Sequence, residues 1–288
     1  MAADFRSVVL TGASTGIGRA CALRLDREGW RVYACVRRAA DGDALRDASS
    51  DRLRPLMLDV TDQDSILAAA GRVKQEVGEA GLHGLINNAG IVVAGPLEFL
   101  KAEHLRQQFE VNVFGQIAVT QAFLPFLRRT RGRIINVGSI SARQLTPFVG
   151  AYGASKCAMA GLTDALRMEL KAWGIPVVLI EPGAVRTPIW DKSRAAGEVM
   201  LEQFSDEAKE LYGPAIEKLK TGISKVEQQA IAPEKVVRAV LHALTASRPK
   251  TRYIVGPEAR IQAIATKILP DRVRDRVILG LLGIPSHP

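Results

Sequence analysis

Short apolar runs alternate with longer amphipathic stretches along most of the chain. The short runs are largely continuous in Val, Ile and Leu, which is typical of strands buried on both faces of a parallel sheet. They are SVVL (7–10), RVYACV (31–36), PLMLD (55–59), GLIN (84–87), RIINVG (133–138), PVVLIE (176–181) and RYIV (252–255). The alternation predicts an α/β fold that is doubly wound, with a parallel sheet of about seven strands and helices on both faces.

The stretches between these runs have the periodicity of helices. The predicted helices span roughly residues 17–28, 62–79, 102–130, 151–173, 203–227 and 233–247. No internal repeat, low-complexity linker or change of composition divides the chain, so we expect one domain over residues 1–256. Residues 188–232 interrupt the alternation near the carboxyl ends of the last two strands, where they would form a lid or pocket wall on the substrate side.

Residues 257–288 are expected to form a helical C-terminal extension. Apolar residues recur at helical spacing, the pattern breaks at Pro270, and a basic stretch precedes the apolar run VILGLLGI (277–284). The apolar positions before the break are Ile261, Ile264, Ala265, Ile268 and Leu269. This extension could pack on its own subunit, or it could contact a partner subunit or an anionic lipid surface through an amphipathic face.

Composition and charge narrow the classes of function. The chain is 47% hydrophobic, which suits a soluble globule with a full core. Its net charge is +9, but the basic residues are not interleaved with aromatics and no nucleic-acid motif occurs. We therefore expect no nucleic-acid binding, and attribute the charge to attraction of an anionic cofactor and to a solvated surface. No signal peptide and no apolar run of about 20 residues is visible, so a cytoplasmic location is expected.

The cysteines and histidines suggest no metal site. Three cysteines, Cys21, Cys35 and Cys157, have no metal-binding spacing and are interpreted as reduced intracellular thiols. The four histidines are scattered along the chain, so we expect no bound metal.

A glycine-rich turn joins the first strand to the first helix in VVLTGASTGIG. Gly12, Gly16 and Gly18 allow a tight turn and close approach of the backbone to a pyrophosphate. The helix that follows would direct its positive end at the phosphates. The strand–turn–helix context at the start of the chain predicts a dinucleotide site, and Ser14 and Thr15 could add hydroxyl donors.

The end of the second strand indicates which dinucleotide is preferred. An acidic residue at this position binds the ribose 2′-hydroxyl of NAD, whereas arginine accepts the 2′-phosphate of NADP. Here Val36 occupies that position and Arg37 and Arg38 follow. The pair predicts NADP, although two arginines here could also be ordinary surface residues.

Tyr152 and Lys156 lie four residues apart in GAYGASKCAMAGL, a run rich in helix formers. On a helix they would share one face. An ammonium beside a phenol favours the phenolate and lowers its pKa, which is one way to build a proton-transfer group. An exposed helix face with an unrelated Tyr and Lys would look the same locally.

The chain resembles the short-chain dehydrogenase/reductase superfamily, which has a Rossmann-type fold. The matching segments are TGASTGIG (11–18), LDV (58–60), NNAG (87–90), VNVFG (111–115), GSIS (138–141), YGASK (152–156) and PGAVRT (182–187). They occur in the family's order from about Ser7 to Pro188. The resemblance implies that residues 1–256 are an NADP-binding catalytic domain.

The resemblance also implies roles for individual residues. Tyr152 would be the general acid in carbonyl reduction and the base in alcohol oxidation. Lys156 would lower its pKa and bind the nicotinamide ribose, Ser139 would bind the substrate oxygen, and Asn112 would hold a water that links Lys156 to solvent. Gly90, like Asn87, could instead mainly shape a turn. The expected cofactor-binding residues are Gly12, Ser14, Thr15, Gly16, Ile17, Gly18, Arg37, Arg38, Asp59, Val60, Asn88, Ala89, Gly90, Tyr152, Lys156, Pro182, Gly183, Val185 and Thr187.

A narrower likeness concerns the substrate. GPLE (95–98), QAFLP (121–125) and the long segment after PGAVRTP resemble the hydroxysteroid and retinol dehydrogenase branch. The implied function is NADP(H)-dependent hydride transfer to or from a bulky apolar ketone or alcohol. Two alternatives stay open, an NAD-dependent alcohol dehydrogenase and a non-catalytic NADP-binding regulatory protein.

The oligomeric state is predicted from two helices. Helices 102–130 and 151–173 carry more apolar residues than one core-facing stripe needs, and the equivalent helices form a subunit interface in the family. We therefore expect a homodimer or homotetramer.

Overall fold

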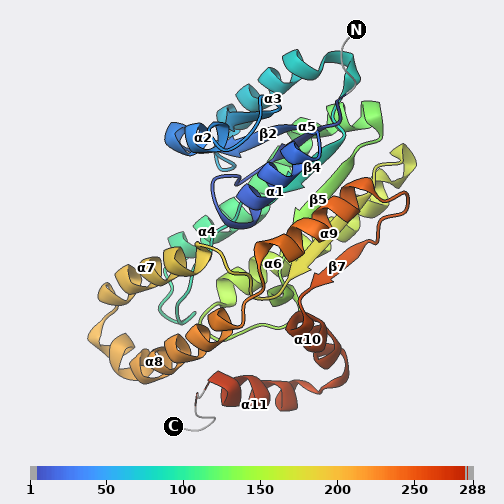
Figure 1. Cartoon of the computed structure of the whole chain (residues 1–288). Coiled ribbons are helices and arrows are strands. Elements are labelled where there is room, and N and C mark those ends of the chain that lie inside the picture. Colours follow the sequence, from blue (N-terminus) through green and yellow to red (C-terminus); the bar gives the residue numbers. More distant parts are fainter. Residues whose placement is uncertain (1–4, 283, 285–288) are drawn as a thin grey trace.

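The computed structural model describes residues 5–282 and 284, and its centre is a parallel β-sheet. The strand order is β3-β2-β1-β4-β5-β6-β7 (Figure 1). The strands are β1 (Ser7–Leu10), β2 (Arg31–Val36), β3 (Leu53–Met57), β4 (Gly84–Asn87), β5 (Arg133–Val137), β6 (Val177–Pro182) and β7 (Arg252–Val255). The predicted fold class is confirmed; the third strand lies two residues nearer the N-terminus than predicted, and the sixth lies one residue nearer the C-terminus.

Helices cover both faces of the sheet. On one face α1 (Gly16–Arg27) packs beside α9 (Pro233–Thr245), and α2 (Ala39–Arg46) closes the edge near β3. On the other face α3 (Gln63–Val77) packs beside α5 (Gly115–Thr130), with α6 (Gly150–Glu169) covering β6. The apolar strand residues therefore divide into two cores, one for each face.

The sheet changes direction of winding at β1. This strand pairs with β2 on one side and with β4 on the other, so the chain turns opposite ways after the two neighbouring strands. In open parallel sheets such a point leaves a crevice at the carboxyl ends of the strands, and ligands bind there.

The predicted helix 102–130 is interrupted. Helix α4 (Ala102–Phe109) passes into a π-helical turn at Glu110–Phe114 before α5 begins. The backbone comes close to Val60 where α5 begins: a Cβ on Gly115 would lie only 2.4 Å from the carbonyl oxygen of Val60. Such turns are frequent at functional sites, and this one places Asn112 in the buried interior.

The segment 188–232 contains two helices, of which the sequence predicted one. Helix α8 (Asp206–Gln228) was expected, but α7 (Ile189–Glu202) was not. None of the side chains of α7 is fully buried, so the helix has no clear core-facing stripe in its sequence. Both helices lie beyond the carboxyl ends of the strands (Figure 1).

The C-terminal extension forms two helices with the predicted break at Pro270. Helix α10 (Pro257–Ile268) buries Ala259 and Ala263 in a small cluster with Ile140. Helix α11 (Asp271–Leu282) packs against α8, where a Cβ on Gly222 would lie 3.2 Å from Leu282. Gly283 and residues 285–288 of the extension lie outside the described residues.

Candidate active site

Each glycine of the first turn is required by its geometry. Gly12 and Gly16 have φ angles of 66° and 57°, which side chains strain to adopt. Gly18 has an ordinary φ, but a Cβ there would lie 2.1 Å from the carbonyl oxygen of Gly12. Among the described residues no side chain caps α1 at Thr15, so the N–H groups of its first turn stay available to an anion in the crevice. Ile17 packs its side chain on the core, which leaves its backbone as the group that can bind a cofactor.

Thr11 fixes this turn to the end of β4. Its Oγ1 accepts hydrogen bonds from the backbone N–H of Asn88 (2.9 Å) and Ala89 (3.1 Å). Asn88 in return donates its Nδ2 to the carbonyls of Thr11 (3.0 Å) and Gly12 (3.1 Å). Asn88 and Ala89, expected at the cofactor, therefore also shape the turn. Thr11 was not predicted, although it opens the glycine motif.

Tyr152 and Lys156 share one face of α6 as predicted. The Lys156 Nζ lies 5.7 Å from the centroid of the Tyr152 ring and donates a hydrogen bond to the carbonyl of Val137 (3.0 Å). Lys156 is only 5% exposed, and this burial lowers its pKa to about 8. The closeness of the two side chains excludes the alternative of an exposed helix face with an unrelated Tyr and Lys.

The pKa of Tyr152 changes in the direction opposite to the one expected. Burial of the phenol raises its pKa, and a hydrogen bond with Ser139 opposes that rise. The ammonium of Lys156 is directed to the Val137 carbonyl at the end of β5. The structure thus brings Tyr152, Lys156 and Ser139 together, while the phenol stays in its neutral, proton-donating form.

Ser139 and Asn112 are held by backbone contacts. Ser139 follows β5, and its Oγ accepts a hydrogen bond from the N–H of Ser141 (3.1 Å). Asn112 accepts from the N–H of Ile91 (2.9 Å) and donates to the Ile91 carbonyl (3.0 Å) and to Ser155 (3.1 Å). A Cβ on Gly90 would lie 3.3 Å from Asn112 Oδ1 and 3.8 Å from Lys156 Nζ, so both groups border the same point.

Asn87 has a structural role. Its Nδ2 donates to Thr120 (2.8 Å) and to Asn136 on the neighbouring strand (2.9 Å), and its side chain is fully buried.

The segment after β6 crosses the crevice toward the glycine turn. Gly183 donates its N–H to the carbonyl of Val255 (2.9 Å), and Pro182 and Val185 are buried. Thr187 faces the turn, since a Cβ on Gly16 would lie 3.0 Å from the Cβ of Thr187. Of the four residues of this segment that were expected to bind the cofactor, Thr187 is the one placed against the glycine turn, while Val185 packs in the core and Gly183 lies against Ala259 of α10.

The adenosine end of the crevice is charged. Arg38 forms a two-pronged ion pair with Asp41 at 2.9 and 2.8 Å, whereas the exposed Arg37 extends beside it. The hydrogen bond from Arg38 lowers the pKa of Asp41, and the charges of Lys192 and Arg37 contribute to the decrease. Lys192 comes from α7, and its Nζ lies 3.4 Å from Thr15 Oγ1. Lys192 was not predicted because its helix was not.

Asp59 and Val60, which were also expected to bind the cofactor, have local contacts. Asp59 accepts hydrogen bonds from the N–H (3.0 Å) and the hydroxyl (2.8 Å) of Thr61. Val60 is buried, and its carbonyl faces Gly115.

A buried carboxylate connects the elements of the site. Glu181, on β6 directly before Pro182, is fully buried and accepts two hydrogen bonds of 2.8 Å from Arg143. Arg252 on β7 contacts both Glu181 and Asp164 of α6. The hydrogen bond that Arg143 donates to Glu181 raises the pKa of Arg143. This network ties the loop after Ser139 to the helix that carries Tyr152, and no sequence motif indicated it.

A glycine turn at the first crossover and a Ser–Tyr–Lys group in the same crevice define an oxidoreductase that uses a nicotinamide cofactor. The chain belongs to the short chain dehydrogenase family, whose model matches residues 6–198. It is therefore an oxidoreductase of the class that acts on alcohols and ketones.

Relatives and solved structures agree with this assignment. The chain is 39% identical over 280 residues to dehydrogenase/reductase SDR family member 9 of Bos taurus, covering 94% of this chain and 86% of the relative. It is 36% identical to retinol dehydrogenase 16 of Mus musculus (94% and 87% covered). A short-chain dehydrogenase from Streptomyces avermitilis superposes with a TM-score of 0.77 at 29% identity, covering 96% of each chain. One from Burkholderia cenocepacia in complex with NADP gives 0.72 at 28% identity, covering 98% of each.

The burial of Lys156 predicts a distinct pH dependence of stability. Its pKa is about 8 in the folded protein and near 10.5 in the unfolded chain, so folding releases a proton between these values. Stability from this group therefore rises with pH across that window, by about 3 kcal/mol in total. Lys156→Met fills similar space and cannot titrate, so the free energy of unfolding of wild type should gain that amount relative to the variant.

Urea unfolding of both proteins from about pH 7 to about pH 10.5 measures the difference. Lys171→Met, at an exposed lysine just after α6, is the control and should follow wild type. Parallel pH curves for wild type and Lys156→Met would contradict the buried, depressed lysine.

Proposed function

We propose that the protein uses NADPH to reduce the ketone of a bulky apolar molecule, and that it catalyses the reverse oxidation of the alcohol. The observation that carries the proposal is the group formed by the half-buried Tyr152 and the buried Ser139 and Lys156. A neutral phenol hydrogen-bonded to a serine, beside a buried ammonium, is suited to give a proton to an oxygen that gains negative charge.

The residues present fit a nicotinamide dinucleotide. The positions of Gly12, Gly16 and Gly18 leave no room for a side chain, and the free N–H groups of α1 face the crevice. When bound, the nicotinamide supplies a hydride to the carbonyl carbon or accepts one from the alcohol.

In reduction, Ser139 donates a hydrogen bond to the substrate oxygen, and Tyr152 transfers its phenolic proton to that oxygen. The charge of Lys156 stabilises the resulting phenolate. In oxidation the phenolate removes the hydroxyl proton instead. The point near Gly90 that both Asn112 and Lys156 border is a place where a water could return a proton to the pair.

The choice of NADP rests on the charges at the adenosine end. Val36 provides no carboxylate for a ribose hydroxyl, while Arg37, Arg38 and Lys192 concentrate positive charge near Thr15. Arg38 is neutralised by Asp41, so Arg37 and Lys192 are the better candidates for a 2′-phosphate. A relative 33% identical to this chain is named an NADPH-dependent 3-dehydrocapnine reductase. NAD-dependent alcohol oxidation is the alternative.

The proposed substrate class rests on the apolar wall of the crevice. Four aromatic side chains gather where the loops after β4 and β5 meet the segment 188–232. The ring centroid of Phe99 lies 5.8 Å from that of Tyr212 and 6.4 Å from that of Phe204. The ring centroids of Phe148 and Tyr212 are 6.0 Å apart. Met200 of α7 packs on a cluster that includes Ala151, the neighbour of Tyr152. Helices α7 and α8 therefore act as the lid of an apolar pocket, in keeping with the retinol dehydrogenases among the relatives.

Two further expectations stay proposals. Exposed Leu162 and Met168 on α6, with Phe114 in the turn before α5, offer an apolar surface for a homodimer or homotetramer. A cytoplasmic location is proposed on the sequence alone. A regulatory protein without turnover is the other alternative, and the complete set of Asn112, Ser139, Tyr152 and Lys156 argues against it.

Tyr152→Phe tests the reaction. The change keeps the ring and removes the proton donor, so NADPH affinity should change little and turnover of apolar ketones should fall by roughly 10²–10⁴-fold. The decrease in NADPH absorbance with a panel of steroid-like, retinoid-like and small polar carbonyl compounds measures both proteins. Near-full turnover by the variant would refute the assignment of Tyr152, and wild type inactive with the whole panel would favour the regulatory alternative.

Arg37→Asp tests the cofactor. It removes a charge-assisted contact to the 2′-phosphate and adds a repulsive carboxylate, so NADPH affinity should fall by about tenfold to a hundredfold and preference should move toward NADH. Fluorescence titration with both dinucleotides gives the dissociation constants. Arg27→Asp, at the opposite end of α1 from the glycine turn, is the matched control. Unchanged NADPH affinity in Arg37→Asp would contradict the proposal.

A further inference from the structure

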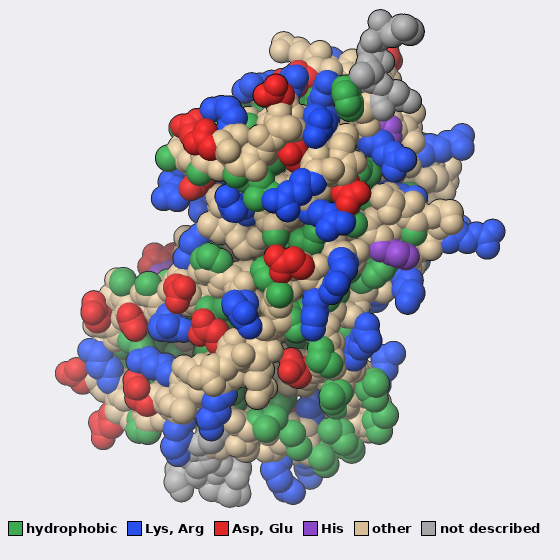
Figure 2. All heavy atoms as spheres, viewed as in Figure 1, with side chains coloured by type: hydrophobic (Ala, Val, Ile, Leu, Met, Phe, Trp, Pro, Cys, Tyr) green, Lys and Arg blue, Asp and Glu red, His purple; other side chains and the backbone are tan. Residues whose placement is uncertain are grey.

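The two C-terminal helices present large apolar side chains to the outside. On α10 these residues are spaced by three and four, and on α11 by four, so each set forms one stripe. We call the six residues the terminal apolar face, and their side chains are between 42% and 76% exposed: Ile261, Ile264, Ile268, Val273, Val277 and Leu281. Figure 2 shows hydrophobic side chains gathered at the lower right, over α10 and its junction with α11, with Lys and Arg side chains beside them. Such a gathering on one face marks an interaction site.

The opposite sides of both helices are anchored. Ala259 and Ala263 of α10 are buried against Ile140, and Ile278 of α11 is buried on the side toward α8. The helices are therefore held in place with their apolar stripes facing outward. Within the described part of the chain these stripes are exposed.

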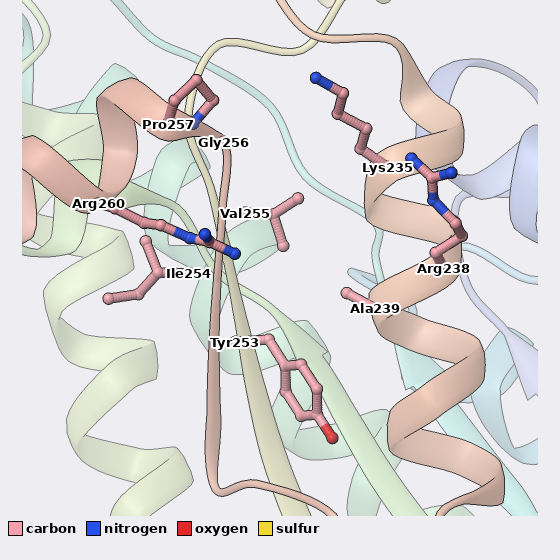
Figure 3. Close-up of a pocket in the computed structure, with 9 residues that line it drawn as sticks. All are labelled: Lys235, Arg238, Ala239, Tyr253, Ile254, Val255, Gly256, Pro257 and Arg260. Carbon is pink, nitrogen blue, oxygen red and sulfur yellow. The ribbon is translucent and has the colours of Figure 1, made fainter.

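A cationic hollow adjoins this face. Its volume is about 480 Å³, and it lies between α9, β7 and α10. In Figure 3 Lys235 and Arg238 project from α9, and Arg260 extends from α10 toward β7. Arg260 lines the hollow and directly precedes Ile261, so α10 contributes both to the hollow and to the apolar face. Within residues 5–282 none of these three cations forms a salt bridge, either with the sequence neighbours Glu234 and Glu258 or with another acidic residue.

Further cations lie on the other side of the apolar face. Arg272 and Arg276 on α11 are exposed, while Arg274 is paired with Asp271. Positive charge thus borders the apolar face on both helices.

We propose that the terminal apolar face and the cationic hollow form a docking surface for an anionic lipid bilayer. The apolar stripes would enter the boundary between headgroups and acyl chains, and Lys235, Arg238 and Arg260 would bind lipid phosphates. Among the described helices none is long and apolar enough to cross a membrane, so the contact would be peripheral.

Charge argues for lipid and against a second copy of the chain. A two-fold contact places the same patch on both subunits, so the apolar faces could meet only by bringing the two sets of uncompensated cations together. Like charges at an interface are unfavourable, whereas a bilayer of anionic lipids offers apolar depth and negative phosphates in the same arrangement.

The position of this surface also suggests how an apolar substrate reaches the site. This consequence rests on the proposed function, but the docking itself does not. Helix α10 packs on Ile140, the residue after Ser139, and α11 packs on α8, which carries Tyr212 of the aromatic wall. A bilayer against these helices would lie next to the lid, so an apolar substrate dissolved in the membrane would have a short route to the site.

Vesicle sedimentation of the full chain, without cofactor or substrate, tests the docking. Wild type should bind vesicles of phosphatidylcholine mixed with phosphatidylglycerol much more tightly than vesicles of phosphatidylcholine alone. Ile264→Ser with Ile268→Ser should weaken binding to both. Lys235→Gln, Arg238→Gln and Arg260→Gln together should remove about a hundredfold of affinity for the anionic vesicles only.

Matched controls make the same changes elsewhere on the surface. Leu67→Ser on α3 and Arg27→Gln on α1 should bind as wild type does. All the substituted residues are exposed, and unchanged thermal unfolding confirms that the variants fold.

Absence of wild-type binding to anionic vesicles would overturn the proposal, as would equal binding by wild type and the isoleucine and cation variants. Light scattering without lipid tests the other possible occupant of the face, a second copy of the chain. A wild-type oligomer that Ile264→Ser with Ile268→Ser converts to monomer would make the face an interface between copies and refute the lipid assignment. Because no turnover is measured, failure here leaves the proposed function untouched.

Discussion

The site is organised around the ammonium group of Lys156, whose burial is unfavourable in free energy because it removes the charge from water. Lys156 has one hydrogen bond, to the Val137 carbonyl, and the Tyr152 ring as a neighbour, and its pKa falls to about 8 because the charged form is poorly solvated. The surrounding structure holds it there. Asn136 on β5 donates to Thr163 of α6 (2.9 Å), and Asn112 donates to Ser155 beside Lys156. These contacts fix the helix that carries the Tyr–Lys pair against the strand that leads to Ser139.

The two ends of the crevice have opposite chemistry, and α7 contacts both. At the adenosine end Lys192 of α7 reaches Thr15 of the glycine turn. At the substrate end Met200 of the same helix packs on the cluster around Ala151. Helix α7 therefore links the glycine turn to the apolar side chains beside Tyr152.

The sequence was informative where the cause is local. Continuous apolar strands predicted the sheet, the helical spacing of Tyr152 and Lys156 predicted their shared face, and the glycine turn was recognised from its context. It was less informative where the cause is a contact between distant segments. The close approach of Gly115 to Val60 beside the π-helical turn, and the buried pair of Glu181 and Arg143, join residues that no sequence pattern connects. Helix α7, and with it Lys192, was missed because the helix buries no complete side chain. The direction in which the pKa of Tyr152 shifts depends on burial of the phenol, and the spacing of residues in the sequence does not reveal that burial.

The measurement closest to the central claim is the titration of Lys156 itself. Nitrogen-detected NMR of lysine-labelled protein, with Lys156→Met to assign the signal, follows the ammonium directly. A buried ammonium beside Tyr152 predicts a midpoint of about 8, well below the ordinary value of 10.5. A midpoint at the ordinary lysine value would mean that the group is solvated, and would contradict the arrangement on which the proton-transfer site depends.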